Sequence, residues 1–258
     1  MVVKELESLP EALKNIRKPP KRLYFSREIS LGSYVAIVGT RNPCPDSIEI
    51  TKKVVRLAKR CQYGVVSGGA NGIDFVAHQE CLDIGCETII VLACGLNKAP
   101  ERLLELEKRG AILISEFDPD KNPARWRFRY RNRLISALSN KVIIIEAGLK
   151  SGALITARYA LEQDKELWAY RGNDSERFTG CKELIEKKHA KEFKTPSEIF
   201  GLSEPEDVDI WLSNLKLPAT FDEILEMSKM PMGELALRLM ELEISGRIKL
   251  FAGRYFRI

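Results

Sequence analysis

The chain has 258 residues, of which 45% are hydrophobic and 30% are charged, and its formal net charge is +5. That apolar share is ample for a packed core, and the length allows one large domain or a medium domain followed by a small one. The N-terminus lacks an apolar signal core and no apolar run approaches the roughly 20 residues of a membrane span, so we predict a cytoplasmic protein without a membrane segment.

The charge is unevenly distributed along the chain. From Ser203 to the end, seven Lys/Arg stand against ten Asp/Glu, a net of −3, which leaves +8 for the preceding residues. We therefore expect a polyanionic partner to bind the first part of the chain. The six cysteines show neither a CxxC pair nor a histidine spacing typical of zinc, so we predict reduced, space-filling thiols and no metal site.

Apolar runs alternate with amphipathic segments over most of the chain. After a lead-in over residues 1–34, which includes a short helix at 10–16, we predict strands at 35–38, 64–67, 88–92, 111–116, 141–146 and 166–170. Helices are predicted at 46–61, after the glycine turn through 81, at 100–109 and near 132–138. A further helix follows the loop at 148–152 and ends at 161, and the charged stretch 181–200 is also predicted to be helical. This alternation predicts an α/β core over residues 35–202 with a parallel sheet and right-handed crossovers.

Ligands of such sheets bind beyond the carboxyl ends of the strands. Residues 39–41, 67–72 and 146–152, together with Gly95 and Glu116, should share that rim. Two of these segments are glycine-rich turns from strand to helix, where free backbone N–H groups and the helix dipole suit a phosphate. Each glycine alone is explained by a tight turn, but together they predict an anionic ligand spread over several subsites.

The segment 125–133 (RWRFRYRNR) alternates five arginines with aromatic rings. If it is extended, the arginines line one side and the rings the other. Two interpretations stay open at this point. The segment is either an edge strand or loop whose rings pack on the core, or a nucleic-acid surface on which guanidinium groups meet phosphates and rings stack on bases.

Two enzyme classes fit the sequence poorly. Neither glycine-rich turn has the GxGxxG pattern and no acid follows the third strand, so we expect no dinucleotide cofactor. Ser67, Asp74 and His78 lie close in sequence but lack a GxSxG elbow, and a capping Asp74 with a half-buried His78 is the simpler interpretation.

The last fifty residues have a different pattern. A linker at 201–205 is followed by amphipathic helices at 208–215, 221–229 and 232–245 and by a hairpin at 246–251 and 254–257, which predicts a winged-helix domain over 203–258. Such modules often enter the major groove of DNA, but the acidic balance favours a protein-contact or accessory role.

In order and spacing, these motifs resemble the DNA-processing protein A (DprA/Smf) family. The resemblance is carried by residues 35–41 (VAIVGTR), 67–74 (SGGANGID) with His78, 113–116 (LISE), Phe128 with 131–133 (RNR), 151–157 (SGALITA), and Gly180 before Leu184 and Ile185. It implies an extended Rossmann-like core that binds single-stranded DNA, and a homodimer that loads a RecA-type recombinase during natural transformation. It implies no catalysis. The N-terminal helical domain of the family is expected to be absent.

Carried over by position, the resemblance implies that Arg41 contacts phosphate and that the two glycine turns offer backbone donors. Phe128, Arg131 and Arg133 are expected to line the DNA path. The full expected nucleic-acid-binding set is Gly39, Thr40, Arg41, Ser67, Gly68, Gly69, Asn71, Gly72, Phe128, Arg131, Asn132, Arg133, Ser151, Gly152 and Thr156. Two positions depart from the family pattern: Arg171-Gly172 stands in place of Pro-Gly, and Lys188-His189 in place of Gly-Ala.

Two alternatives remain. A nucleotide-processing Rossmann enzyme would release the base from nucleoside monophosphates with Glu116 and Glu146 as its acids, although the Pro-Gly-Gly-x-Gly-Thr turn of that group is missing here. A sequence-specific duplex binder would act through the winged helix.

Overall fold

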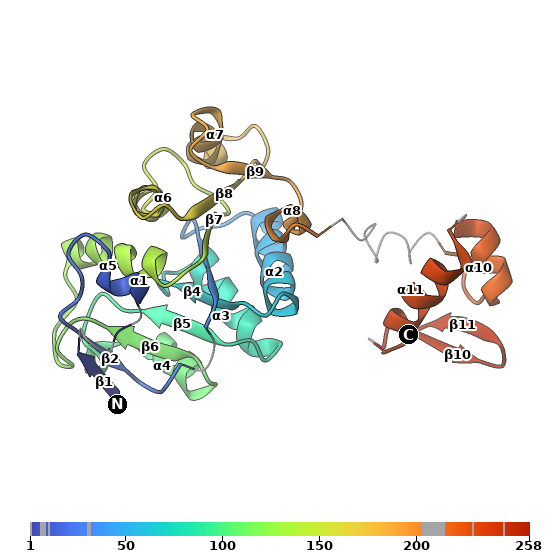
Figure 1. Cartoon of the computed structure of the whole chain (residues 1–258), viewed down its shortest axis with the longest axis horizontal. Coiled ribbons are helices and arrows are strands. Elements are labelled where there is room, and N and C mark those ends of the chain that lie inside the picture. The colour runs from blue at the N-terminus through green and yellow to red at the C-terminus, as the bar shows by residue number, and fades with distance from the viewer. Residues whose placement is uncertain are drawn as a thin grey trace. The chain divides into compact units, whose positions relative to one another are not determined.

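The computed structural model describes residues 9, 11–29, 32–202, 215–228, 230–244 and 246–258, and the backbone of residues 2–5. The chain divides into two compact units, Met1–Leu202 and Ser203–Ile258, which Figure 1 shows.

The first unit is built on a nine-stranded sheet with the order β1-β2-β6-β5-β4-β3-β7-β8-β9. Strands β3 through β9 are mutually parallel, whereas β2 pairs antiparallel with β6 and β1 antiparallel with β2. Their bounds are β1 Val2–Glu5, β2 Arg22–Phe25, β3 Tyr34–Val38, β4 Gly64–Ser67, β5 Thr88–Val91, β6 Ile112–Ser115, β7 Lys141–Ile144, β8 Glu166–Tyr170 and β9 Lys191–Phe193.

Helices cover both faces of the sheet. The helices of this unit are α1 Glu11–Lys14, α2 Pro45–Arg60, α3 Ile73–Asp83, α4 Glu101–Lys108, α5 Arg125–Ala137, α6 Ala153–Glu162, α7 Thr179–Glu186 and α8 Pro196–Phe200. One core cluster packs α1, α5, α6 and α7 on one face, and a second packs α2, α3 and α8 on the other. Every residue of β3, β4, β5 and β6 is buried, as expected of parallel strands between two helical layers.

The two ends of the sheet differ from the sequence prediction. The lead-in contributes β1 and β2, because Leu23 and Phe25 are buried in the core and β2 pairs with β6 through Phe25 and Ile114. The stretch 181–200 is not one helical run. Lys188 has a positive φ of 54°, which ends the helical region, and β9 then brings Phe193 into the core.

The arginine-rich segment 125–133 is not extended. It forms the first turns of α5, which runs from Arg125 to Ala137. Arginine is a good helix former, and helical spacing places Trp126 and Tyr130 on one side, with their ring centroids 5.9 Å apart. The alternation that suggested a strand therefore distributes the arginines around a helix.

The second unit is a small helical domain with a hairpin. Helices α10 Phe221–Ser228 and α11 Met232–Ile244 pack with strands β10 Ile248–Phe251 and β11 Arg254–Arg257 around Ile224, Leu235, Leu239, Leu242 and Ile248. This is a winged-helix domain, whose predicted first helix at 208–215 and the end of the predicted linker lie almost wholly outside the described residues. Among the described helices of either unit, none is long and apolar enough to cross a membrane.

Candidate nucleic-acid interface

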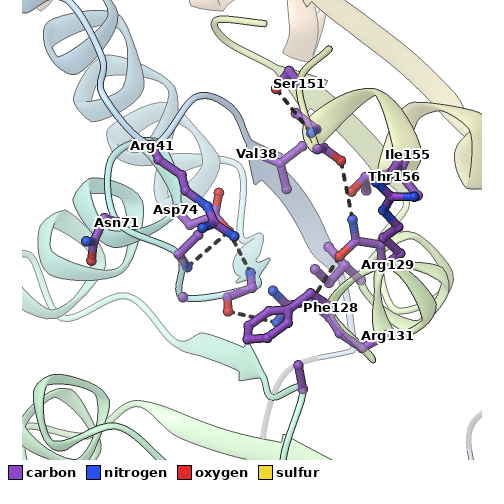
Figure 2. A pocket seen from close by; sticks show the side chains of 18 of the residues that line it. Val38, Arg41, Asn71, Asp74, Phe128, Arg129, Arg131, Ser151, Ile155 and Thr156 are labelled. Carbon is purple, nitrogen blue, oxygen red and sulfur yellow. Dashed lines mark hydrogen bonds between the residues drawn. The ribbon is translucent and has the colours of Figure 1, made fainter. Parts of the chain in front are cut away.

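A groove of about 1650 Å³ lies where β3, β4, β5 and β7 end. Its walls come from the turns that follow these strands, from the beginning of α5 and from the beginning of α6. In Figure 2, Arg41 extends toward the middle of the groove from one wall, and Ser151 and Thr156 lie on the wall across. Several turns meet there because parallel strands finish on the same edge of the sheet.

Most of the residues expected from sequence line this groove. They are Gly39, Thr40, Arg41, Gly68, Gly69, Asn71, Phe128, Arg131, Asn132, Ser151, Gly152 and Thr156. Sequence segments more than a hundred residues apart therefore form one continuous wall.

Ser67 and Gly72 do not line the groove, and each has a structural role instead. Ser67 is fully buried and its Oγ donates a hydrogen bond to the carbonyl oxygen of Ile37 at 2.6 Å, which ties β4 to β3. Gly72 has a φ of 83°, and a Cβ there would stand 2.3 Å from the carbonyl oxygen of Thr40. Glycine at this position lets the turns after β3 and β4 touch.

Arg133 is the clearest correction to the expected DNA path. Its Nη1 and Nη2 pair with the two carboxylate oxygens of Glu116 at 2.6 and 2.5 Å, and its Nε donates to the carbonyl oxygen of Lys18 at 3.0 Å. The side chain is only 2% exposed and its guanidinium lies 3.7 Å from the ring centre of Tyr130. Because Arg133 is paired with Glu116 and does not line the groove, it is not placed to meet a phosphate bound there.

Arg131 reaches the groove but is largely enclosed by protein. Its Nη1 donates to the carbonyl oxygens of Gly68, at 2.8 Å, and of Val91. Its Nε donates to the side-chain oxygen of Asn132 at 3.0 Å. Burial lowers the pKa of Arg131 to about 10, so the group stays charged at neutral pH. Through the hydrogen bond to Gly68, Arg131 holds the turn that follows β4 in place.

Asp74 holds the same turn from its other side. Its Oδ2 accepts hydrogen bonds from the N–H groups of Gly68, at 3.2 Å, and Ala70, at 3.4 Å. Burial raises the pKa of Asp74, and the charge of Arg131 and these hydrogen bonds oppose the rise. Two of the donors that the sequence assigned to a phosphate are thus used internally. Among described residues, the N–H groups of Asn71 and Gly152 have no partner and remain available.

The groove has a strongly positive lining. Among the residues that the structure describes, it carries eight lysine and arginine side chains against the single carboxylate of Asp74. Arg102 donates to the carbonyl oxygen of Gly69 and Arg158 pairs with Glu162. The others besides Arg131 form no ion pair or hydrogen bond with any other described residue: Arg41, Lys98, Arg125, Arg129 and Lys150. Uncompensated cations facing one cavity create a field that attracts a polyanion.

Sequence reasoning did not select these additional cations individually. Arg125 and Arg129 belong to the arginine-rich segment, and Lys150 lies in the predicted loop before α6, so each had a local signal. Lys98 and Arg102 had none, because only the crossover after β5 brings them to the groove.

Exposed rings complete the lining. The Phe128 side chain is 40% exposed, and no described aromatic ring contacts it. Trp126 is 58% exposed, but it packs on Phe117 with ring centroids 6.2 Å apart and on Tyr130. Phe128 therefore offers a free aromatic face beside the cations.

Neither Glu116 nor Glu146 lines the groove. Glu116 is paired with Arg133, and Glu146 is 1% exposed, accepts the N–H of Cys44 at 2.9 Å and pairs with Arg177 at 3.0 Å. Burial raises the pKa of Glu146, but hydrogen bonds from Cys44, Ser47 and Arg177 outweigh it, so the net pKa is lowered and the carboxylate is kept ionised.

The two departures from the family pattern also lie away from the groove. Arg171 pairs with Glu192 at 3.3 Å, and Gly172, with a φ of 61°, packs under the ring of Phe178. Lys188 and His189 are exposed beyond the end of α7. Neither pair of substitutions changes the lining.

Comparison with known proteins relates the chain to DNA-processing proteins. It is 35% identical over 198 residues to DNA processing protein DprA of Bacillus subtilis, covering 74% of this chain and 67% of that protein. It is 34% identical over 222 residues to protein Smf of Escherichia coli, covering 75% of this chain and 59% of that protein. In Smf of Synechocystis the match, at 36% identity, covers 68% of this chain and 47% of the relative. The chain thus spans between about half and two thirds of these relatives.

Solved structures give the same relationship. DprA of Streptococcus pneumoniae superposes with a TM-score of 0.72 at 28% identity, covering 79% of this chain and 74% of that one. DprA of Helicobacter pylori, a structure described for its single-stranded DNA binding mode, gives a TM-score of 0.70 at 32% identity, covering 77% and 94% of the two chains. A DprA winged helix domain model matches residues 216–254. Because the model for DNA recombination-mediator protein A matches residues 1–203, the chain belongs to that family.

Proposed function

We propose that this protein binds single-stranded DNA in the groove and delivers it to a RecA-type recombinase, as a homodimer and without catalysing a reaction. The observation that carries the proposal is the set of cations that no described residue neutralises, gathered around the free ring of Phe128. Phosphates bind such cations with release of counterions, and an unpaired base can stack on such a ring.

The lining favours an unpaired strand over a duplex. Stacking on Phe128 requires a base whose face is free, and a base inside a duplex is stacked on its neighbours. The described lining comes from strand-end turns and the beginnings of α5 and α6, whereas the major groove of a duplex is read by a helix or ribbon that enters it. The related H. pylori protein is described as binding single-stranded DNA, which agrees with this assignment.

The absence of catalysis is part of the proposal. Among described residues, Asp74 is the one carboxylate of the lining; it is 6% exposed and accepts hydrogen bonds from two backbone N–H groups. Glu116 and Glu146, the acids of the nucleotide-processing alternative, are tied to Arg133 and Arg177 outside the groove. A general acid must reach the reacting bond, so none of these three carboxylates supports release of a base.

The recombinase partner and the homodimer rest on the family. The matching family is described as a recombination mediator. A protein that delivers a strand to a recombinase must contact both the strand and the recombinase. We expect the protein to speed the start of strand-dependent ATP hydrolysis by a purified RecA-type recombinase, and light scattering should give twice the monomer mass. A lag unchanged by the protein would remove the recombinase from the proposal while leaving the DNA site intact.

The DNA site is tested by fluorescence anisotropy with an oligothymidylate of about 20 nucleotides at two salt concentrations. The double variant Arg41→Ala/Arg129→Ala should bind about tenfold or more weakly, and its slope of log affinity on log salt should be shallower by about 1.4, at about 0.7 per lost phosphate contact. Arg60→Ala, which removes an exposed cation of α2 outside the groove, is the matched control. Equal binding by both variants would reject the groove as the DNA site.

A further inference from the structure

Positive and negative charges lie on different parts of the winged-helix unit. We define the wing as residues 246–258. It contains Arg247, Lys249, Arg254 and Arg257 and no aspartate or glutamate, so it is basic. Helices α10 and α11 carry the opposite charge: Asp222, Glu223, Glu226, Glu234, Glu241 and Glu243 stand there against Arg238 alone. The acidic average of the unit therefore does not describe its hairpin.

The wing is a tight hairpin with a defined outer face. Its turn residues Ala252 and Gly253 both have positive φ, 50° and 75°, as two-residue hairpin turns require. In the register of β10 and β11, Lys249 lies opposite Phe256 and Phe251 lies opposite Arg254. Alternate residues along a strand, and directly opposed residues across a pair, share a face, so these four side chains lie on one side.

The inner face of the wing makes the core contacts. Ile248 is 1% exposed, and Tyr255 packs against the same cluster as α10 and α11. The outer face, in contrast, holds two phenylalanines that the core does not use. Phe251 is 66% and Phe256 37% exposed, and their ring centroids are 6.5 Å apart. A solvent-facing side of a hairpin is ordinarily polar, so this pair of rings departs from the pattern.

We infer that the outer face of the wing is a second contact for single-stranded DNA. Phe251 and Phe256 offer stacking surfaces to two bases, and Lys249 and Arg254 lie beside them to meet phosphates. Lys249 forms no ion pair or hydrogen bond with any other described residue. Arg254 approaches Glu223 at 3.7 Å, but both side chains are half exposed, and such surface pairs are weak enough to be exchanged for a phosphate.

This inference takes its ligand from the proposed function but concerns a separate surface. Because the wing and the groove belong to one chain, a strand held in the groove raises the local concentration of DNA near the wing. A long oligonucleotide can use both contacts, whereas one short enough to fill only the groove cannot. Dependence on oligonucleotide length is therefore the signature of the wing.

Helix α11 supplies the contrast within the same unit. Leu237 is 66% and Met240 62% exposed, so this surface is as apolar as the wing. Its neighbours are Glu234 and Glu241, which repel phosphate, and aliphatic side chains offer no ring for a base. Exposed apolar area alone therefore does not mark the contact; the combination of rings and cations does.

The test uses the full chain and two oligothymidylates, of about 6 and about 40 nucleotides. Phe251→Leu/Phe256→Leu keeps apolar bulk but removes the rings. It should weaken binding of the long strand about tenfold and leave the short strand unchanged. Met240→Ala is the control and should bind both strands as the unmodified protein does. An unchanged affinity of the leucine variant for the long strand overturns the inference, and so does an equal loss for both strands, which would indicate damage to the whole protein.

Two further arms separate this inference from the proposed function. In the groove variant Arg41→Ala/Arg129→Ala, an iodouracil-substituted single strand should still become photocrosslinked to a peptide that contains Phe251 or Phe256. A crosslink found only in residues 1–202 overturns the wing contact without touching the groove. A duplex of the same length should not compete at equal nucleotide concentration, and stronger competition by duplex than by single strand overturns the assignment to an unpaired strand.

Discussion

The guanidinium of Arg131 lies directly against Gly68, since a Cβ at position 68 would stand 2.3 Å from Nη2 and 2.5 Å from Cζ. The same guanidinium donates to the Gly68 carbonyl oxygen at 2.8 Å, while Asp74 accepts the Gly68 N–H. The glycine after β4 is therefore needed for a close approach of an arginine. Its role is to let one residue of α5 fix the shape of a turn from another part of the chain.

Gly68→Ala should displace Arg131 and destabilise the first unit. Overpacking of a closely fitted site is expected to lower the free energy of unfolding by about 1–3 kcal/mol, as measured by denaturant titration. The matched control is Gly152→Ala, where nothing lies within 4 Å of the added Cβ and φ is −62°. That control should stay within about 0.5 kcal/mol of the unmodified protein. A stable Gly68→Ala variant would show that Arg131 has another position open to it.

Arg133→Ala should lower stability rather than DNA affinity. It leaves the carboxylate of Glu116, which is 9% exposed, without its partner, and removal of one member of a buried pair costs about 3–5 kcal/mol. The double variant Arg133→Met/Glu116→Leu removes both charges and should recover most of that loss. Below the temperature of unfolding, anisotropy with single-stranded DNA should be nearly unchanged in both. A selective loss of DNA binding by a fully folded Arg133→Ala protein would contradict the assigned structural role.

Phe128→Ala should weaken single-stranded DNA binding without altering its dependence on salt. Loss of one stacked base corresponds to about 1–3 kcal/mol, while the number of phosphate contacts stays the same. Phe128→Tyr keeps a ring and should bind normally. Because Phe128 is 40% exposed and has no described ring partner, thermal unfolding should change little. A reduced salt slope in the alanine variant would mean that the ring acts by positioning cations and not by stacking.

Acidification should destabilise the protein through His78. This side chain is fully buried with Nδ1 2.7 Å from Thr88 Oγ1, and burial, assisted by the charges of Arg131 and Arg102, lowers the pKa of His78 to about 3. Between that value and the unfolded pKa of about 6.5, only the unfolded chain binds the proton, so stability falls as the pH falls.

From pH 7 to pH 5 the contribution of His78 should be a loss of about 2 kcal/mol in the free energy of unfolding. Denaturant titrations of His78→Asn across this range should show a shallower slope against pH than the unmodified protein, whatever the absolute stability of the variant. His189→Gln, which changes an exposed histidine, should follow the unmodified slope. Identical slopes in all three proteins would contradict a buried, neutral His78.

The strands of the core could be predicted because their signal is local. Runs such as those at β3 and β5 are almost wholly apolar and are buried at every position, the pattern typical of a short strand buried on both faces. The strands β2 and β9, near the two ends of the sheet, carried a weaker signal, because each is short and β2 pairs with β6, which is distant in sequence. The conformation of the arginine-rich segment could not be predicted for a related reason. Its sequence is compatible with the periodicity of a strand or of a helix, and packing of α5 against α6 and the sheet stabilises the helix.

By itself, the sequence determined the α/β alternation, the winged-helix unit and the rim where strand ends meet, since these follow from hydrophobic periodicity and from glycine at turns. It also determined that the net positive charge lies before residue 203. Only the tertiary structure decided what each arginine does. Arg129 and Arg133 are four residues apart on the same helix, yet one faces the groove and the other is enclosed with Glu116. The reason is physical: a guanidinium binds a phosphate or an internal carboxylate through the same geometry, and which one it meets depends on contacts between elements far apart in the chain.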